Sequence, residues 1–278
     1  MTTKWPDSHL VALDTETTGP NPLNDRIVTA AIVHTQPGRR PLSIQWLIQP
    51  GIPIEPEAAE IHGWTQQRLD DTLAGAEAVR IANGETRPLT RDGALFEIAA
   101  QAATAMHAGA PLVVHNAAFD LTLLETELTH AGIDTLSSRP DGIRGVVDPM
   151  VIEKQFDPFR KVKNGCKGGK VRCNGCGMTD KKLTSLCAHY GVTHTGAHDA
   201  AADALAAIRL THRLVAAWPQ IGTWKLGTLH QHQVGWRAEQ SDSLRSFWRK
   251  SDDIRWSEVD SGWPLHSACT PGLVGVGS

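Results

Sequence analysis

Carboxylate side chains stand where two predicted strands end, and together they could hold metal ions. Asp14 and Glu16 lie in LDTETTG, at the end of the apolar run HLVALD (9–14). Side chains alternate between the two faces of a strand, so these carboxylates point to the same side. Asp120 follows a second apolar run, PLVVHN (111–116), and parallel pairing of the two strands would bring it beside Asp14. An isolated D-x-E pair is more often a solvated turn feature, and the third acid favours a site.

A fourth carboxylate, near the start of the alanine-rich segment 199–217, would complete a cage of acids. Four clustered carboxylates repel one another and stay ionised only when cations offset their charge. Oxygen ligands of this kind select hard ions such as Mg²⁺ or Mn²⁺. The pattern therefore predicts a divalent-metal site at the carboxyl ends of the central strands.

The segments that must position these acids alternate between strand and helix patterns. Short β-rich runs predict five strands, at residues 9–14, 26–34, 42–48, 111–116 and 143–148. Helical patterns occupy much of 56–83 and the segments 93–109, 118–131, 183–190, 199–217 and 225–250. An initial meander followed by alternating strands and helices predicts an α/β fold with a mixed five-stranded sheet.

Three motifs in order resemble those of a known family. DTETTG, HNAAFD and HDAAAD are similar to the three exonuclease motifs of the DEDDh 3′–5′ exonucleases, the DnaQ-like group that includes the proofreading ε subunit of DNA polymerase III. AAEIHGWT (58–65) also resembles the family's HGIT-type stretch, with Trp64 where an aliphatic residue is more usual. The resemblance spans residues 9–217 and implies a ribonuclease H-like α/β/α sandwich.

Two domains follow from this resemblance and from the composition of the rest. Residues 1–220 are expected to form the exonuclease domain, with an insertion at 158–180. Residues 221–278 are Trp-rich and are expected to form a helical extension with a tail. The predicted helix of this extension resembles that of stand-alone actinobacterial or phage members.

Carried over residue by residue, the resemblance implies roles for five side chains. Asp14, Glu16, Asp120 and Asp203 would bind two Mg²⁺ or Mn²⁺ ions, and His198 would act as the general base. A histidine suits that role because its unperturbed pKa lies near working pH.

The third motif fits the sequence in two registers. His194 with Asp199 and His198 with Asp203 both satisfy H-x-x-x-x-D. The second pair is favoured, because HDAAADA also places small residues where the family has them. Asp199 is then expected to be a helix N-cap, and His194 a loop residue.

Four residues of the same motifs are candidates to contact substrate: Thr17, His62, Asn116 and Phe119. Phe119 could stack on a terminal base, since aromatic stacking tolerates every base, and core packing is the equal alternative. His62 could line the pocket for the terminal nucleotide or cap a helix end.

The resemblance implies hydrolysis of DNA from the 3′ end, releasing nucleoside 5′-monophosphates, with single-stranded or frayed ends as substrate. The same chemistry on RNA, as in oligoribonuclease and ribonuclease T, stays open because no residue is identified that senses the 2′-hydroxyl group. A non-catalytic nucleic-acid-binding or polymerase-docking module is disfavoured, because all five catalytic positions hold competent residues. A DNA polymerase is the candidate protein partner, and proofreading in trans or independent degradation both remain open.

Charge and hydrophobicity bound the class of protein. The 278 residues carry a formal net charge of -3, and no apolar run approaches the roughly 20 residues that a membrane span needs. The start MTTKWPDSH has no signal-peptide layout, so a cytoplasmic protein of a bacterial or phage-infected cell is expected. Residues 154–182 hold nine Lys or Arg and two Asp, so a basic arm accompanies an otherwise acidic chain and could grip a phosphate backbone.

The same insertion holds three cysteines, Cys166, Cys173 and Cys176. C-x-x-C thiolates bind tetrahedral Zn²⁺, and a short basic loop needs something to order it, so one structural zinc is expected. A redox C-x-x-C and a loop with idle thiols are the alternatives. Cys187 lies on an apolar helical face and is expected in the core, which leaves His189 as a candidate fourth ligand.

We expect about one zinc ion per chain, measured by elemental analysis of protein purified anaerobically. Serine at both Cys173 and Cys176 should remove it, because hydroxyl groups do not replace thiolates as zinc ligands. A wild-type protein without zinc would contradict the prediction.

Overall fold

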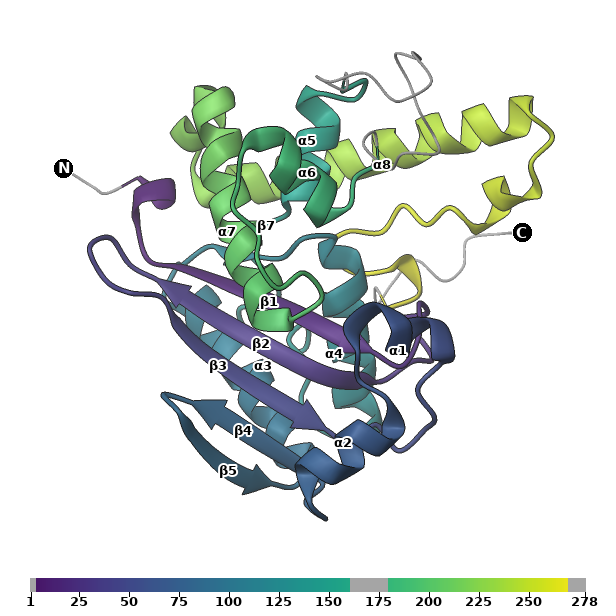
Figure 1. The fold of residues 1–278 in the computed structure, drawn as a ribbon. Coiled ribbons are helices and arrows are strands. Elements are labelled where there is room, and N and C mark those ends of the chain that lie inside the picture. Colours follow the sequence, from purple (N-terminus) through teal and green to yellow (C-terminus); the bar gives the residue numbers. More distant parts are fainter. Residues whose placement is uncertain (1–3, 161–179, 270–278) are drawn as a thin grey trace.

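A mixed sheet of seven strands forms the middle layer of the protein (Figure 1). The computed structural model describes residues 4–160 and 180–269. The strands are β1 (Leu10–Thr17), β2 (Ile27–Thr35), β3 (Leu42–Ile48), β4 (Ala78–Ala82), β5 (Glu85–Leu89), β6 (Leu112–Val113) and β7 (Val146–Val147). Their order is β5-β4-β3-β2-β1-β6-β7, antiparallel from β5 to β1 and parallel from β1 to β7.

Helices cover both faces of this sheet (Figure 1). The α-helices are α1 (Pro56–His62), α2 (Gln66–Leu73), α3 (Arg91–His107), α4 (Ala117–His130), α5 (Pro149–Phe156), α6 (Leu183–Tyr190), α7 (Ala200–Ala217) and α8 (Leu226–Lys250). Short 3₁₀ turns lie at Trp5–Asp7, Pro219–Thr223, Ile254–Glu258 and Ser267–Cys269. None of the described helices is long and apolar enough to cross a membrane. The predicted layered α/β fold with a mixed sheet is confirmed.

Strand β1 divides the core between two helical layers. Val11 and Leu13 are fully buried in the cluster that includes α3 and α4, whereas Leu10 and Ala12 are buried in the cluster that includes α7. This alternation follows from the two-residue period of a strand. It sets the sides to which Asp14, Thr15 and Glu16 point.

The prediction of five strands was wrong, because β4 and β5 form a hairpin within a region predicted as helix followed by a break. Asn83 and Gly84 connect them, with φ of 53° and 78°. Two successive left-handed residues match the twist of paired strands, which makes Asn-Gly a strong hairpin signal. The helical period was correct only as far as α2, which ends at Leu73.

Helix α8 completes the edge of the sheet at β7. The Asp148 N–H donates to the Gln233 side-chain oxygen at 2.7 Å, and the Gln233 amide donates to the Val146 carbonyl at 2.9 Å. The Val146 N–H donates to Nδ1 of His230 at 3.3 Å. An unpaired strand edge would leave these backbone groups without partners, so two side chains of α8 take the place of a further strand.

His230 should make the protein less stable in acid. Burial lowers the pKa of His230 to about 4. Between pH 6.5 and 4 this histidine is therefore protonated in the unfolded chain and neutral in the folded protein. The free energy of unfolding should therefore fall with pH across this window, by up to about 3 kcal/mol from this residue. The measurement is urea unfolding at a series of pH values.

His230→Asn keeps an acceptor that does not titrate, so its unfolding free energy should fall less steeply over the same window. His232→Asn, at an exposed position of the same helix, is the matched control and should follow the wild type. Parallel curves for wild type and His230→Asn would contradict the prediction.

Candidate active site

Acidic side chains converge where β1 ends. Asp14 and Glu16 continue the even-numbered face of β1 that α7 covers, while Thr15 points to the opposite face. The Thr15 hydroxyl donates to Oδ1 of Asp120 at 2.7 Å, which ties α4 to the end of the strand. Asp120 is buried and lies in the first turn of α4.

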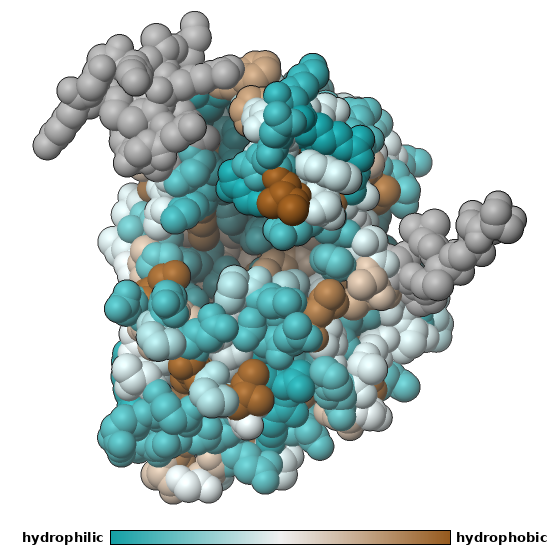
Figure 2. All heavy atoms as spheres, turned by 90° about the vertical axis from the view of Figure 1, so that its right-hand side faces the viewer, coloured by the Kyte–Doolittle hydropathy of each residue, from teal (hydrophilic) through white to brown (hydrophobic). Residues whose placement is uncertain are grey.

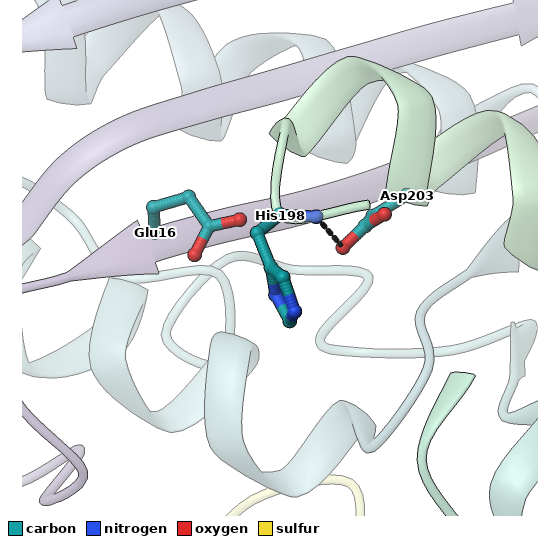
Figure 3. A group of neighbouring side chains, drawn as sticks. All are labelled: Glu16, His198 and Asp203. Carbon is teal, nitrogen blue, oxygen red and sulfur yellow. Dashed lines mark hydrogen bonds between the residues drawn. The ribbon is translucent and has the colours of Figure 1, made fainter. Parts of the chain in front are cut away.

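The fourth acid comes from the first turn of α7. Asp199 caps this helix by accepting from the Ala202 N–H at 3.0 Å, as predicted. Asp203 lies one turn further on, and its Oδ2 accepts from the backbone N–H of His198 at 3.2 Å (Figure 3). Glu16, His198 and Asp203 each offer a potential ligand atom, and these atoms lie within 4.8 Å of one another.

The pKa values of these acids respond to crowding and burial. Burial, followed by the charges of Asp120, Asp203 and Glu16, raises the pKa of Asp14 well above its usual value. Burial and the neighbouring acids raise the pKa of Glu16 to about 8. Burial raises that of Asp120 to about 7, although the bond from Thr15 acts in the opposite direction. Asp14, Glu16 and Asp120 can all be ionised at neutral pH only if cations accompany them, which fits divalent metal ions.

His62, the last residue of α1, joins this helix to the end of β1. Its Nε2–H donates to the Thr17 carbonyl at 3.1 Å, and its Nδ1 accepts from the Trp64 N–H at 3.1 Å. Both ring nitrogens are therefore engaged within the protein. The Thr17 hydroxyl is likewise engaged, donating to the Gly19 carbonyl at 2.7 Å. Burial lowers the pKa of His62, and the charge of nearby His198 acts in the same direction.

A buried acid that the sequence analysis did not single out shapes the turn before α4. Asp148 accepts from the backbone N–H groups of Asn116 at 3.0 Å and Ala117 at 2.9 Å. Asn116 has a left-handed φ of 66°, and Phe119 lies half-buried against the core. Asp148 also caps α5, and Asp-Pro after an apolar run is a signal for such a cap.

His194 is the second residue whose part in the site the sequence did not reveal. It lies in the loop between α6 and α7, as expected, and its Nε2 is hydrogen-bonded to Oδ1 of Asp203. The His194 side chain is only 6% exposed, whereas His198 is exposed at the surface. The histidines of both possible registers of the third motif therefore contact the same carboxylate, that of Asp203.

The predicted zinc ligands Cys166, Cys173 and Cys176 lie outside the described residues. Cys187 is buried, which confirms its predicted place in the core. His189 makes an edge contact with the ring of Tyr190, with centroids 4.7 Å apart.

Both described ends of the insertion are held by one buried carboxylate. Arg160 Nη1 lies 3.1 Å from Oε1 of Glu153, and the Lys181 amine donates to Oε2 of Glu153 at 2.6 Å. His115, the first residue of the second motif, donates from Nε2 to the Lys181 carbonyl at 2.9 Å. The base of the basic arm is thereby connected to the strand that leads into α4.

The face of the molecule drawn in Figure 2, which is the right-hand side of Figure 1, is mainly hydrophilic. Figure 2 shows apolar side chains lying singly among hydrophilic ones, and a hollow between an upper part that carries α8 and a lower part that carries α1 and α2.

Comparison with known proteins agrees with this fold. Residues 11–90 match the family model RNase_T, described as an exonuclease. A structure of E. coli exonuclease I in complex with a dT13 oligonucleotide aligns with a TM-score of 0.58 and 18% identity over 77% of this chain. Exonuclease I from Methylocaldum szegediense aligns with a TM-score of 0.55 and 20% identity over 86% of this chain. No curated protein matches the sequence.

These findings show a match to an exonuclease family model over residues 11–90 and a fold shared with exonuclease I. They do not single out the DnaQ-like group. The protein covers 42% of the E. coli chain and 46% of the Methylocaldum chain, so it spans less than half of the length of these relatives.

Glu16 should destabilise the metal-free protein at alkaline pH. Folded Glu16 keeps its proton up to about pH 8, whereas the unfolded chain releases it near pH 4.5, so stability is lost as pH rises through this window. In EDTA, Glu16→Gln, which is neutral at every pH, should become more stable than wild type above pH 8. The difference should be a few kcal/mol, since one pKa unit corresponds to about 1.4 kcal/mol.

Chemical denaturation at pH 5 and pH 9 measures this difference. Glu239→Gln, at an exposed position of α8, is the matched control and should keep the wild-type pH dependence. If Glu16→Gln and wild type kept a constant difference at both pH values, the explanation by burial and repulsion would be wrong.

Proposed function

We propose that the protein is a metal-dependent 3′–5′ exonuclease that releases nucleoside 5′-monophosphates from the 3′ ends of single-stranded DNA. The observation that carries the proposal is the convergence of Asp14, Glu16, Asp120 and Asp203 at the end of β1, with an exposed histidine at its rim. The raised pKa values of three of these acids support the proposal, because bound cations would offset the charge of the ionised carboxylates.

The four carboxylates would hold two Mg²⁺ or Mn²⁺ ions, since oxygen ligands suit hard divalent cations. When bound, such ions supply positive charge and Lewis acidity at the scissile phosphate. The protein's part is to fix the carboxylates. Thr15 orients Asp120 through one hydrogen bond, and the His198 backbone orients Asp203 through another.

His198 is proposed as the general base that takes a proton from the attacking water. Its backbone is fixed by the bond to Asp203 and by a left-handed φ of 67°, while its ring is exposed beside Glu16 and Asp203 (Figure 3). An exposed imidazole beside a carboxylate site can both reach substrate and exchange its proton with solvent. His62 cannot take this role without breaking two internal hydrogen bonds.

The choice of DNA draws on the solved relatives. Structures of E. coli exonuclease I hold dT13 and dA16 oligonucleotides. A strand of either sugar type presents the same phosphate to the carboxylates, so RNA must be included in any test. The predicted DNA polymerase partner remains a prediction.

Asp14→Asn should lower the turnover number by at least about 100-fold, because loss of a carboxylate weakens metal binding where charge develops. His198→Gln should lower it by about 100- to 10,000-fold. Asp199→Asn is the matched control: asparagine caps helices as well as aspartate, so activity should be kept. Wild type should need Mg²⁺ or Mn²⁺ and stop in EDTA.

The assay uses oligonucleotides labelled at the 5′ end, so that a ladder of shortened labelled products reports removal from the 3′ end. Single-stranded DNA, duplex DNA and RNA of one sequence are compared. A ladder on RNA alone would replace DNA by RNA in the proposal. Full activity of Asp14→Asn, or immediate release of labelled mononucleotide, would overturn it.

A further inference from the structure

The Asp203 carboxylate forms hydrogen bonds with two residues that precede its helix. His194 Nε2 contacts Oδ1, and the backbone N–H of His198 donates to Oδ2 at 3.2 Å. One carboxylate therefore has a donor at each oxygen. These donors lie nine and five residues before Asp203, in the segment between α6 and α7.

With Asp203 ionised, Nε2 of His194 carries a proton in this contact. A carboxylate oxygen only accepts, so an unprotonated ring nitrogen facing it at hydrogen-bonding distance would be repelled. The donor is thus fixed by chemistry, whether or not the other ring nitrogen is protonated. With its Nε2 lone pair replaced by N–H and its side chain 6% exposed, His194 is not placed to act as a base toward substrate.

The segment that carries His194 is tied to the same helix as Asp203. The Arg209 guanidinium, on α7, donates from Nη1 to the carbonyl of Thr193 at 3.2 Å. Asp203 and Arg209 lie six residues apart on α7. The loop is therefore attached to α7 at two neighbouring residues, through the Thr193 carbonyl and through the His194 side chain. These two attachments limit how far the imidazole can shift.

We propose that His194 is a positioning residue that holds the Asp203 carboxylate in the orientation required for metal binding; this rests on the proposed function. Each carboxylate oxygen has two acceptor positions, and the two donors occupy one on each oxygen. One position per oxygen remains available to a cation. Rotation of the carboxylate, which would otherwise compete with metal binding, is restrained by hydrogen bonds at both oxygens.

Supporting hydrogen bonds of this kind matter for metal affinity. Loss of a residue that orients a metal ligand typically costs 10- to 100-fold in affinity or activity. His194→Ala should therefore weaken Mn²⁺ binding about 10- to 100-fold, and raise the Mg²⁺ concentration for half-maximal nuclease activity to a similar extent. The binding constant for Mn²⁺ alone is measured by electron paramagnetic resonance, without substrate.

Two amide variants separate the hydrogen bond from the bulk of the side chain. The amide nitrogen of glutamine matches the position of Nε2 in histidine, whereas that of asparagine lies nearer the backbone, like Nδ1. His194→Gln should recover most of the Mn²⁺ affinity, and His194→Asn should bind Mn²⁺ as weakly as His194→Ala. A residue that merely filled space would not distinguish the two amides in this way.

A fourth variant keeps the test sound if the His194 variants fold poorly. Arg209→Gln removes the charged donor to the Thr193 carbonyl at an exposed position and leaves His194 in place. It should weaken Mn²⁺ binding, by less than His194→Ala, while its melting temperature in EDTA stays close to that of wild type.

Three results would overturn the proposal. Mn²⁺ affinity equal to wild type in folded His194→Ala would show that orientation by His194 is not needed. Equal weakening in His194→Gln and His194→Asn would show that the hydrogen bond is not the cause. A wild type that neither binds Mn²⁺ nor degrades nucleic acid would overturn the proposed function and this inference together, whereas an active wild type with unaffected variants would overturn the inference alone.

Discussion

Mutual repulsion among buried carboxylates is the constraint on which the rest of this structure depends. Asp14, Glu16, Asp120 and Asp203 come from one strand and two helices, and burial and repulsion raise the pKa of the first three. Left alone, such a cluster would push its elements apart or take up protons. The fold opposes this with donors aimed at single oxygens, from Thr15 to Asp120 and from the His198 backbone to Asp203. Under the proposed function, these hydrogen bonds orient the carboxylates before cations bind.

The elements that carry the acids are fixed by one strand and one buried aspartate. Strand β1 lies inside the sheet with helices on both faces, so alternate side chains reach α4 and α7. Asp148 then accepts from the turn before α4, caps α5 and accepts from the Trp263 indole at 3.2 Å. Because one fully buried carboxylate satisfies donors from three segments, the turn that sets Asp120 cannot shift independently of the C-terminal segment.

The C-terminal helix is part of the same framework. The parallel end of the sheet has only two residues in each of β6 and β7, too few to protect an edge by themselves. His230 and Gln233 of α8 supply the missing partners. The solved exonuclease I chains are more than twice as long as the region that this protein covers. In this protein α8, which follows α7 after one short 3₁₀ turn, completes the sheet. The side chains of His230 and Gln233 are buried, and each forms hydrogen bonds with backbone groups of the sheet edge.

The sequence by itself determined the parts that depend on local pattern. The order of the three motifs, the period of β1 and the N-cap of α7 at Asp199 could be predicted, because alternation and capping are properties of neighbouring residues. It also contained the Asn83–Gly84 signal for the β4–β5 hairpin. This signal was missed because the predicted helical pattern was extended beyond the end of α2. Only the tertiary structure decided that His194 bonds to Asp203 and that Asp148 serves both α4 and α5. Such contacts join residues that no short-range period relates, and they form only when separate elements pack together.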